Sequence, residues 1–296
     1  MSAAPKVPRS WLFAPGDQPA KMAKASASGV GAVILDLEDS VAEANKPAAR
    51  SATAEFLAAR PAADAVGAPQ LWVRMNPFST PHALADLAAV VPSGPDGIVL
   101  PKIDGPHEAI RLAERLREIE AEAGLAEGQV KILAIGTETP ASLFTLGGYG
   151  AVGPRLIGLT WGAEDLPAAV GAQINRYPDG QLTDLCRLAR TLCLAGASAA
   201  GVAPIETVYP NFRDPEGLRA YAALGRQEGF VGMMAIHPAQ VEIIETVFRP
   251  SEEEIAHARR VVEAFAANPG AGVLALDGKM LDRPHLTQAE RLLAGL

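Results

Sequence analysis

Short apolar runs recur along the chain and alternate with longer segments that have the spacing of amphipathic helices. Each run is too short for a helix and ends in polar or turn-forming residues, a pattern typical of buried strands. We therefore expect eight strands, at Trp11–Ala14, Ala32–Leu37, Leu71–Met75, Gly97–Pro101, Ile132–Ile135, Leu156–Thr160, Ala199–Ala203 and Val231–Ile236.

Segments rich in Ala and Leu lie between most of these runs, and their spacing predicts helices at Pro81–Val90, His107–Ala123, Leu182–Ala195 and Pro215–Glu228. Strand and helix alternating eight times predict an α/β fold, a (β/α)8 TIM barrel, over residues 1–250. The alternative is an open doubly wound sheet, which does not need eight strands.

Residues 251–296 follow the eighth strand, and a barrel does not need them to close. A helix is expected at Ser251–Asn268, where Ser251 and Glu254 have capping-box spacing. An extended piece at Ala271–Leu276, a turn at Asp277-Gly278 and a helix at His285–Leu293 complete a C-terminal helical or lid extension.

The amino-acid composition limits the classes of partner and the cellular location that we expect. The 296-residue chain is 49% hydrophobic and 20% charged, with a net charge of −8, so an acidic surface argues against nucleic acid as a partner. We find neither a signal peptide nor eighteen consecutive apolar residues, so we expect a cytoplasmic protein with no membrane partner. The two cysteines, Cys186 and Cys193, are expected to be buried apolar residues.

Two acidic residues follow successive strands in the segment from Lys131 to Asp165. In a parallel crossover, both strands end on the same face, so Glu138 and Asp165 can converge on one point. Paired carboxylates suit a hard cation such as Mg²⁺. The alternative is that Glu138 caps a turn and that Glu164 or Asp165 caps a helix.

Polar residues follow every predicted strand, as expected where the chemistry of a barrel is located. Arg74 and Lys102 directly follow apolar runs, which is unusual for solvated cations. A Schiff base at Lys102 would require loss of its charge, which nearby acids oppose. His237 is either a base or a structural hydrogen-bonding residue. P-loop, serine-hydrolase and zinc-protease motifs are absent from the sequence.

Taken together, the strand-end motifs resemble those of the citrate lyase β-subunit-like family, within the aldolase/citrate lyase superfamily. That group includes malyl-CoA, β-methylmalyl-CoA and citramalyl-CoA lyases. The resemblance covers nearly the whole chain in order. Its motifs are RSWLFAPG (9–16), AVILDLEDSV (32–41) with Lys46 and Arg50, WVRMN (72–76), VLPK (99–102), TETP (137–140), PRLIGLTWGAEDL (154–166), AIHP (235–238) and DGKMLDRP (277–284).

The resemblance implies roles for individual residues. Glu138 and Asp165 would hold Mg²⁺, with Glu138 also near the substrate. Arg74 would bind the substrate and act in catalysis, and Asp282 of the tail would be catalytic in a neighbouring subunit. Coenzyme A would contact Arg9 and Lys21; family members often have an arginine near Gln18 or Lys21. They also commonly read IET where this chain has TET at 137–139.

The implied reaction is Mg²⁺-dependent carbon–carbon cleavage of a 3-hydroxy dicarboxylic acyl-CoA, such as malyl-CoA or citramalyl-CoA, to an acyl-CoA and a 2-oxo acid. Two alternatives remain: a citrate lyase β-type subunit acting on a carrier-bound citryl thioester, and a class II pyruvate aldolase acting on free hydroxy-oxo acids. The partners implied are an acyl-CoA thioester, a 2-oxo acid and further copies of the chain, in a homotrimer or homohexamer.

Overall fold

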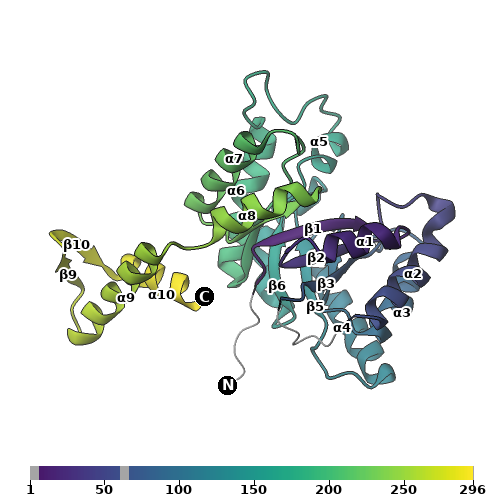
Figure 1. Cartoon of the computed structure of the whole chain (residues 1–296), viewed down its shortest axis with the longest axis horizontal. Coiled ribbons are helices and arrows are strands. Elements are labelled where there is room, and N and C mark those ends of the chain that lie inside the picture. Colours follow the sequence, from purple (N-terminus) through teal and green to yellow (C-terminus); the bar gives the residue numbers. More distant parts are fainter. Residues whose placement is uncertain (1–6, 61–66, 296) are drawn as a thin grey trace. The chain divides into compact units, whose positions relative to one another are not determined.

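The computed structural model describes residues 7–60 and 67–295. Eight parallel strands form a closed barrel, in which each strand pairs with the next and β1 pairs with β8 (Figure 1). This confirms the predicted TIM-barrel fold. The strands are β1 (Ser10–Pro15), β2 (Ala32–Asp36), β3 (Gln70–Arg74), β4 (Gly97–Leu100), β5 (Lys131–Ile135), β6 (Leu156–Thr160), β7 (Ala203–Glu206) and β8 (Gly232–Ala235).

Helices follow the strands in the order expected for the barrel. The predicted helix Pro215–Glu228 has the same bounds in the structure, and the other three agree at one end or both to within a few residues. The helices are α1 (Pro19–Ser26), α2 (Lys46–Ala58), α3 (Ala83–Val90), α4 (Pro106–Ala123), the short α5 (Asp165–Ala169), α6 (Asp184–Ala200), α7 (Pro215–Glu228) and α8 (Val241–Phe248).

The predicted position of the seventh strand, Ala199–Ala203, is wrong, because the strand lies further along the chain at Ala203–Glu206. Helix α6 continues to Ala200 and ends at Gly201, whose φ of 69° is left-handed. Alanine is the best helix former, so Ala199 and Ala200 extend the helix until Gly201 ends it. Strand β7 therefore begins only at Ala203.

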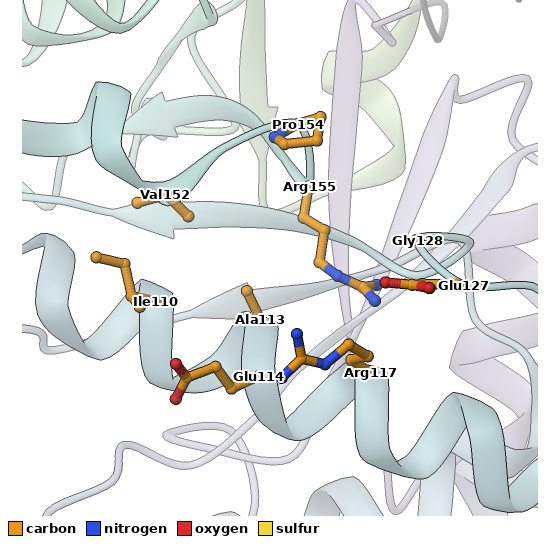
Figure 2. Close-up of a pocket in the computed structure, with 9 residues that line it drawn as sticks. All are labelled: Ile110, Ala113, Glu114, Arg117, Glu127, Gly128, Val152, Pro154 and Arg155. Atoms are coloured by element: carbon orange, nitrogen blue, oxygen red, sulfur yellow. The ribbon is translucent and has the colours of Figure 1, made fainter.

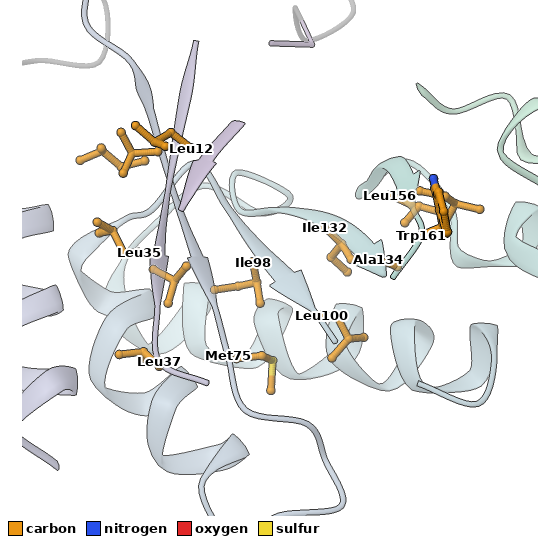
Figure 3. Close-up of a cluster of buried hydrophobic side chains, with 14 of the residues drawn as sticks. Leu12, Leu35, Leu37, Met75, Ile98, Leu100, Ile132, Ala134, Leu156 and Trp161 are labelled. Carbon is orange, nitrogen blue, oxygen red and sulfur yellow. The ribbon is translucent and has the colours of Figure 1, made fainter. Parts of the chain in front are cut away.

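Apolar side chains from neighbouring strands form a continuous core (Figure 3). Leu12, Leu35 and Ile98 are almost completely buried and belong to this cluster. Trp11 of β1 and Trp72 of β3 also pack together, with their rings edge to face and the ring centroids 5.1 Å apart. A Cβ on Gly97 would lie 2.1 Å from the Trp72 ring, so this position accommodates only glycine without displacing the ring. These contacts fix the barrel on which the site residues stand.

The chain divides into two compact units, one at Pro8–Phe248 and another that includes the chain from Arg249 onward. The latter contains α9 (Glu252–Ala267), the antiparallel hairpin β9 (Val273–Leu276) and β10 (Lys279–Asp282), and α10 (Arg283–Ala294). Ser251 caps α9 reciprocally with Glu254, as predicted. The unit that contains α9 has a small core of its own, made of Ala258, Val261, Phe265, Leu281 and Ala289.

In the part of the chain that the structure describes, no helix is long and apolar enough to cross a membrane.

Candidate active site

Charged side chains gather where the barrel strands end. The carboxyl ends of parallel strands lie at one end of a barrel, so residues that directly follow successive strands become neighbours. Five carboxylates and two cations meet there: Asp36, Glu38, Asp39, Glu138 and Asp165 with Arg74 and Lys102. The excess of carboxylates over cations favours binding of a further cation.

Arg74 ends β3 and forms a two-point contact with Asp36 at the end of β2. Its Nε and Nη2 groups donate to the two oxygens of Asp36 at 2.7 Å each, and Nη1 lies 3.0 Å from Glu38 Oε2. Burial alone would lower the pKa of Arg74, but the charges of Asp36 and Glu38 raise it above its usual range. The guanidinium is therefore a permanent, fixed positive charge.

Lys102 follows β4 and links three of the carboxylates. Its Nζ donates to Glu38 Oε1 at 2.5 Å and to Asp39 Oδ2 at 2.7 Å, and lies 3.3 Å from Asp165 Oδ1. Burial would lower the pKa of this ammonium, but hydrogen bonds to Asp39 and Glu38 raise it well above its usual range. Lys102 is thus held charged, which disfavours a Schiff base, as the sequence indicates.

The backbone of Lys102 is also unusual, because its φ of 50° lies in the left-handed region that lysine rarely occupies. In this conformation its N–H donates to Glu138 Oε2 at 2.6 Å, while its side chain extends to the acids after β2. Strained backbone of this kind is concentrated at functional sites. Lys102 therefore connects β4 to both β2 and β5.

Glu138 follows β5 and is almost completely buried, at 4% exposure. Burial, followed by the negative charges of Glu38 and Asp165, raises the pKa of Glu138 to about 8. Gly162 lies directly against this side chain, because a Cβ at that position would be 2.6 Å from Glu138 Cγ. Gly162 N–H also donates to Thr137 Oγ1 at 3.1 Å, a contact that uses the residue in which this chain departs from the IET pattern.

The residues at this end of the barrel fit a divalent cation that prefers oxygen. Glu138 follows β5 and Asp165 follows the adjacent β6, and both contact Lys102. The Lys102 N–H donates to Glu138 Oε2 at 2.6 Å, and its Nζ lies 3.3 Å from Asp165 Oδ1. Among residues 7–60 and 67–295, no group of three or more His, Cys, Asp and Glu side chains could hold a metal. Mg²⁺ typically takes only one or two protein carboxylates and keeps several waters, so a two-carboxylate site suits it.

The structure does not bring Arg9 to this site. Arg9 precedes β1, and its carbonyl accepts a hydrogen bond from Met233 N at the start of β8, so it lies at the amino ends of the strands. The prediction that Arg9 contacts a cofactor bound with the other site residues is therefore not supported by its position. Lys21 lies in α1, which follows the carboxyl end of β1, and is exposed at the same end of the barrel as Arg74.

Asp282 belongs to the unit that begins at Arg249. It ends β10 and is the N-cap of α10, where its Oδ1 lies 2.5 Å from His285 Nδ1. Within its own unit, Asp282 is partly exposed, and its carboxylate has a histidine as immediate partner. This arrangement places a carboxylate and an imidazole in contact at the surface of the tail.

Two other polar residues that follow strands have structural partners. Glu206 is fully buried and accepts from Trp161 Nε1 at 2.5 Å and Arg190 Nε at 2.8 Å. His237 accepts from Ala239 N at 3.1 Å and stacks on the Phe212 ring. These contacts tie helices and loops to the barrel, and they match the structural alternative for His237.

A surface hollow of about 480 Å³ lies elsewhere, between α4 and the turn before β6 (Figure 2). Pro154 and Arg155 line it and precede β6, so it is at the opposite end of the barrel from Glu138. Arg155 forms a buried ion pair with Glu120, with hydrogen bonds of 2.8 and 2.5 Å. This ion pair joins α4 to the start of β6, and the hollow is not part of the candidate active site.

Sequence reasoning places Glu38 among the strand-end residues but does not identify it as a shared partner of Arg74 and Lys102. Strand β2 ends at Asp36, so Glu38 lies in the turn after it, and the alternation of side chains along a strand does not predict where Glu38 points. The contacts themselves depend on the tertiary arrangement of β2, β3 and β4.

The fold and the charged strand ends place the chain among (β/α)8-barrel enzymes. The model of the HpcH/HpaI aldolase/citrate lyase family matches residues 9–238. The chain therefore belongs to the HpcH/HpaI aldolase/citrate lyase family, a family of carbon–carbon lyases and aldolases.

Individual relatives extend the similarity over nearly the whole chain. The citrate lyase subunit beta-like protein of Mycobacterium tuberculosis is 36% identical over 96% of this chain and 93% of its own length. A (3S)-malyl-CoA thioesterase of Cereibacter sphaeroides is also 36% identical, over 97% of this chain and 93% of its own length.

Among solved structures, protein CitE from Mycobacterium tuberculosis in complex with magnesium, acetoacetate and coenzyme A superposes with a TM-score of 0.75. It is 35% identical, and the match covers 97% of each chain. The similarity therefore includes the segment after the barrel as well as the barrel itself.

Proposed function

We propose that the protein is a Mg²⁺-dependent carbon–carbon lyase that cleaves a 3-hydroxy dicarboxylic acyl-CoA, such as malyl-CoA or citramalyl-CoA, to an acyl-CoA and a 2-oxo acid. We expect it to act in the cytoplasm. The observation that carries the proposal is one connected group of charges at the strand ends. Glu38 lies 3.0 Å from Arg74 Nη1 and accepts from Lys102 Nζ. Lys102 in turn contacts Glu138 through its N–H and Asp165 through its Nζ. The CitE structure with magnesium, acetoacetate and coenzyme A supports the ligand class.

Glu138 and Asp165 would hold the Mg²⁺ ion. When bound, Mg²⁺ polarises the oxygen of the oxo group and stabilises negative charge on it. The two carboxylates leave most coordination positions for water and for a chelating 2-oxo acid. Glu138 would therefore lie beside the substrate as well as the metal.

Arg74 would hold the 2-oxo acid portion of the substrate. Its guanidinium has five N–H donors, of which Asp36 takes two and Glu38 faces a third, so two remain for a carbonyl or carboxylate oxygen. Asp36 and Glu38 fix the guanidinium before substrate arrives, and such preorganised donors favour the developing charge of the transition state.

The reaction requires one proton to leave and another to arrive. The 3-hydroxyl proton is lost, the carbon–carbon bond breaks, and its electron pair moves to the α-carbon of the thioester, which then takes up a proton. We assign proton transfer at the α-carbon to Asp282, supplied by the tail of a neighbouring subunit in a trimer or hexamer. Residues 251–296 would thus contribute to both the oligomer and the active site.

Lys21 would contact the phosphates of coenzyme A as a point charge, because it is exposed and follows the carboxyl end of β1. A thioesterase outcome is a second candidate, since one relative at 36% identity is named a (3S)-malyl-CoA thioesterase. In that case the acyl-CoA formed or bound would be hydrolysed to free coenzyme A.

A substrate panel tests the proposal. Purified protein with Mg²⁺ is incubated with malyl-CoA, citramalyl-CoA, a carrier-bound citryl thioester and free hydroxy-oxo acids, while 2-oxo acid and free thiol are measured separately. Release of 2-oxo acid from a CoA thioester supports the proposal, and free thiol in addition indicates thioester hydrolysis. Cleavage of only the carrier-bound thioester or of only the free acids would establish one of the alternatives instead.

A further inference from the structure

A buried lysine lies behind the active-site residues. Lys46 is the first residue of α2 and is only 8% exposed. Its ammonium group has three N–H donors and three acceptors: Leu37 O at 3.0 Å, Glu38 O at 3.1 Å and Asn76 Oδ1 at 2.7 Å. All three are neutral oxygens at the ends of β2 and β3. With every donor used, Lys46 has none left for a substrate.

The acceptors of Lys46 are themselves firmly held. Asn76 Nδ2 donates to Leu37 O at 2.8 Å and to Asp86 Oδ2 at 2.7 Å, and Asn76 N donates to the same Asp86 oxygen. Asp86 is fully buried and also accepts from Arg50 Nε at 2.7 Å. This network joins α2 and α3 to the ends of β2 and β3, and it uses neither Glu138 nor Asp165.

Glu38 connects the network to the active site. Its N–H donates to Asp36 Oδ1 at 3.0 Å and its carbonyl accepts from Lys46, so the backbone is held on both sides. Its carboxylate lies 3.0 Å from Arg74 Nη1 and accepts from Lys102 Nζ. Movement of the Glu38 backbone would therefore move the partners of both cations.

We propose that Lys46 is a positioning residue for the substrate-binding arginine. It ties the carbonyls of Leu37 and Glu38 to Asn76, and the fixed Glu38 carboxylate in turn holds the guanidinium of Arg74 in one place. This inference rests on the proposed function in one respect, namely that Arg74 holds the 2-oxo acid. For comparison, loss of the outer hydrogen-bond partners of metal ligands typically lowers affinity or activity about 10- to 100-fold.

The test compares Lys46→Met with Arg60→Met. Methionine has a chain of similar length and no N–H donor. Arg60 is a matched control, because it also joins a loop through hydrogen bonds, to Asp96 Oδ2 at 2.7 Å and Gly94 O at 2.8 Å. Asp96 directly precedes β4, so this control lies at the opposite end of the barrel.

Three measurements are made on the full chain. Amide hydrogen exchange in the peptide containing Leu37 and Glu38 should accelerate about 10-fold or more in Lys46→Met, and stay unchanged in Arg60→Met. Calorimetry with pyruvate in the presence of Mg²⁺ should show about 10-fold weaker binding in Lys46→Met, with Mg²⁺ affinity within about twofold of the parent. The kcat for 2-oxo acid release should fall about 10- to 100-fold.

The proposal is wrong if Lys46→Met retains parental exchange in this peptide and parental pyruvate affinity. It is also wrong if both methionine variants lose pyruvate affinity equally, since that would indicate a general loss of stability. If Lys46→Met does not fold, Lys46→Arg replaces it and should show the same local changes, because a planar guanidinium does not fit the same three acceptors. If the parent releases no 2-oxo acid from any CoA thioester, the proposed function fails, while hydrogen exchange still decides the role of Lys46.

Discussion

Arg74 and Asp36 form a two-point ion pair between the ends of neighbouring strands, with both hydrogen bonds at 2.7 Å. Asp36 is buried, which would raise its pKa, but the charge of Arg74 and its hydrogen bonds lower the pKa below the usual range. The pair therefore remains ionised and presents the rest of the guanidinium in a fixed orientation.

Arg74→Lys is expected to lower kcat/KM for 2-oxo acid release by about 10²- to 10³-fold, because an ammonium cannot contact both Asp36 oxygens and still present a planar pair of donors to substrate. Mg²⁺ affinity, measured by calorimetry, should remain near the parental value. A parental rate in this variant would assign Arg74 a purely structural role.

Gly162→Ala should weaken Mg²⁺ binding about 10- to 100-fold, because the new Cβ would lie 2.6 Å from Glu138 Cγ and displace the carboxylate. Gly147→Ala is the matched control, since a Cβ there meets nothing within 4 Å. Calorimetric titration of both variants with Mg²⁺ checks the prediction. Equal affinity in the two variants would show that Glu138 does not hold the metal or that the site adapts freely.

Much of this arrangement follows from the sequence, for a physical reason. Strands buried on both faces give continuous apolar runs, and a parallel crossover then fixes Glu138 and Asp165 at one end of the barrel. The start of β7 is predicted wrongly because Ala199 and Ala200 belong to an apolar run that resembles a strand, whereas they continue helix α6. The left-handed backbone of Lys102 and the shared contacts of Glu38 have no local signature, because they arise only when three strands come together.

The pKa of Glu138 predicts a specific pH dependence. Its value in the fold is about 8, against an ordinary value of 4.5, so the folded state binds the proton more tightly than the unfolded state. The stability from this proton is complete below the unfolded pKa and is lost as the pH rises through about 8. Without Mg²⁺, the free energy of unfolding should therefore fall across this range.

Glu138→Gln should lack the fall in the free energy of unfolding that is due to Glu138, because an amide does not titrate. Mg²⁺ affinity of the parent should rise about tenfold per pH unit below about pH 8, since metal must displace the proton. Denaturant unfolding in a chelator and calorimetry at several pH values measure the two effects. A parent and Glu138→Gln with the same pH dependence of unfolding would contradict the assignment of the titration to Glu138.

The role assigned to Asp282 predicts complementation between subunits. Asp282→Ala and Glu138→Ala should each be inactive alone, whereas mixed oligomers should recover activity, because about one quarter of randomly assembled sites contain both native groups. Mass measurement of the oligomer and exchange of labelled subunits serve as controls. No recovery after confirmed exchange would mean that Asp282 acts within its own chain, as a lid, or has no catalytic role.

Glu138 and Asp165 are proposed to form the Mg²⁺ site of a lyase that cleaves a carbon–carbon bond within a CoA thioester. The most direct measurement is the rate of 2-oxo acid release from the best CoA thioester, for the parent, Glu138→Ala and Asp165→Ala, over a Mg²⁺ titration. The parent should show saturable dependence on Mg²⁺ that a chelator abolishes, and both variants should be folded but inactive at every Mg²⁺ concentration. A variant that binds Mg²⁺ and turns over as the parent does would contradict this claim.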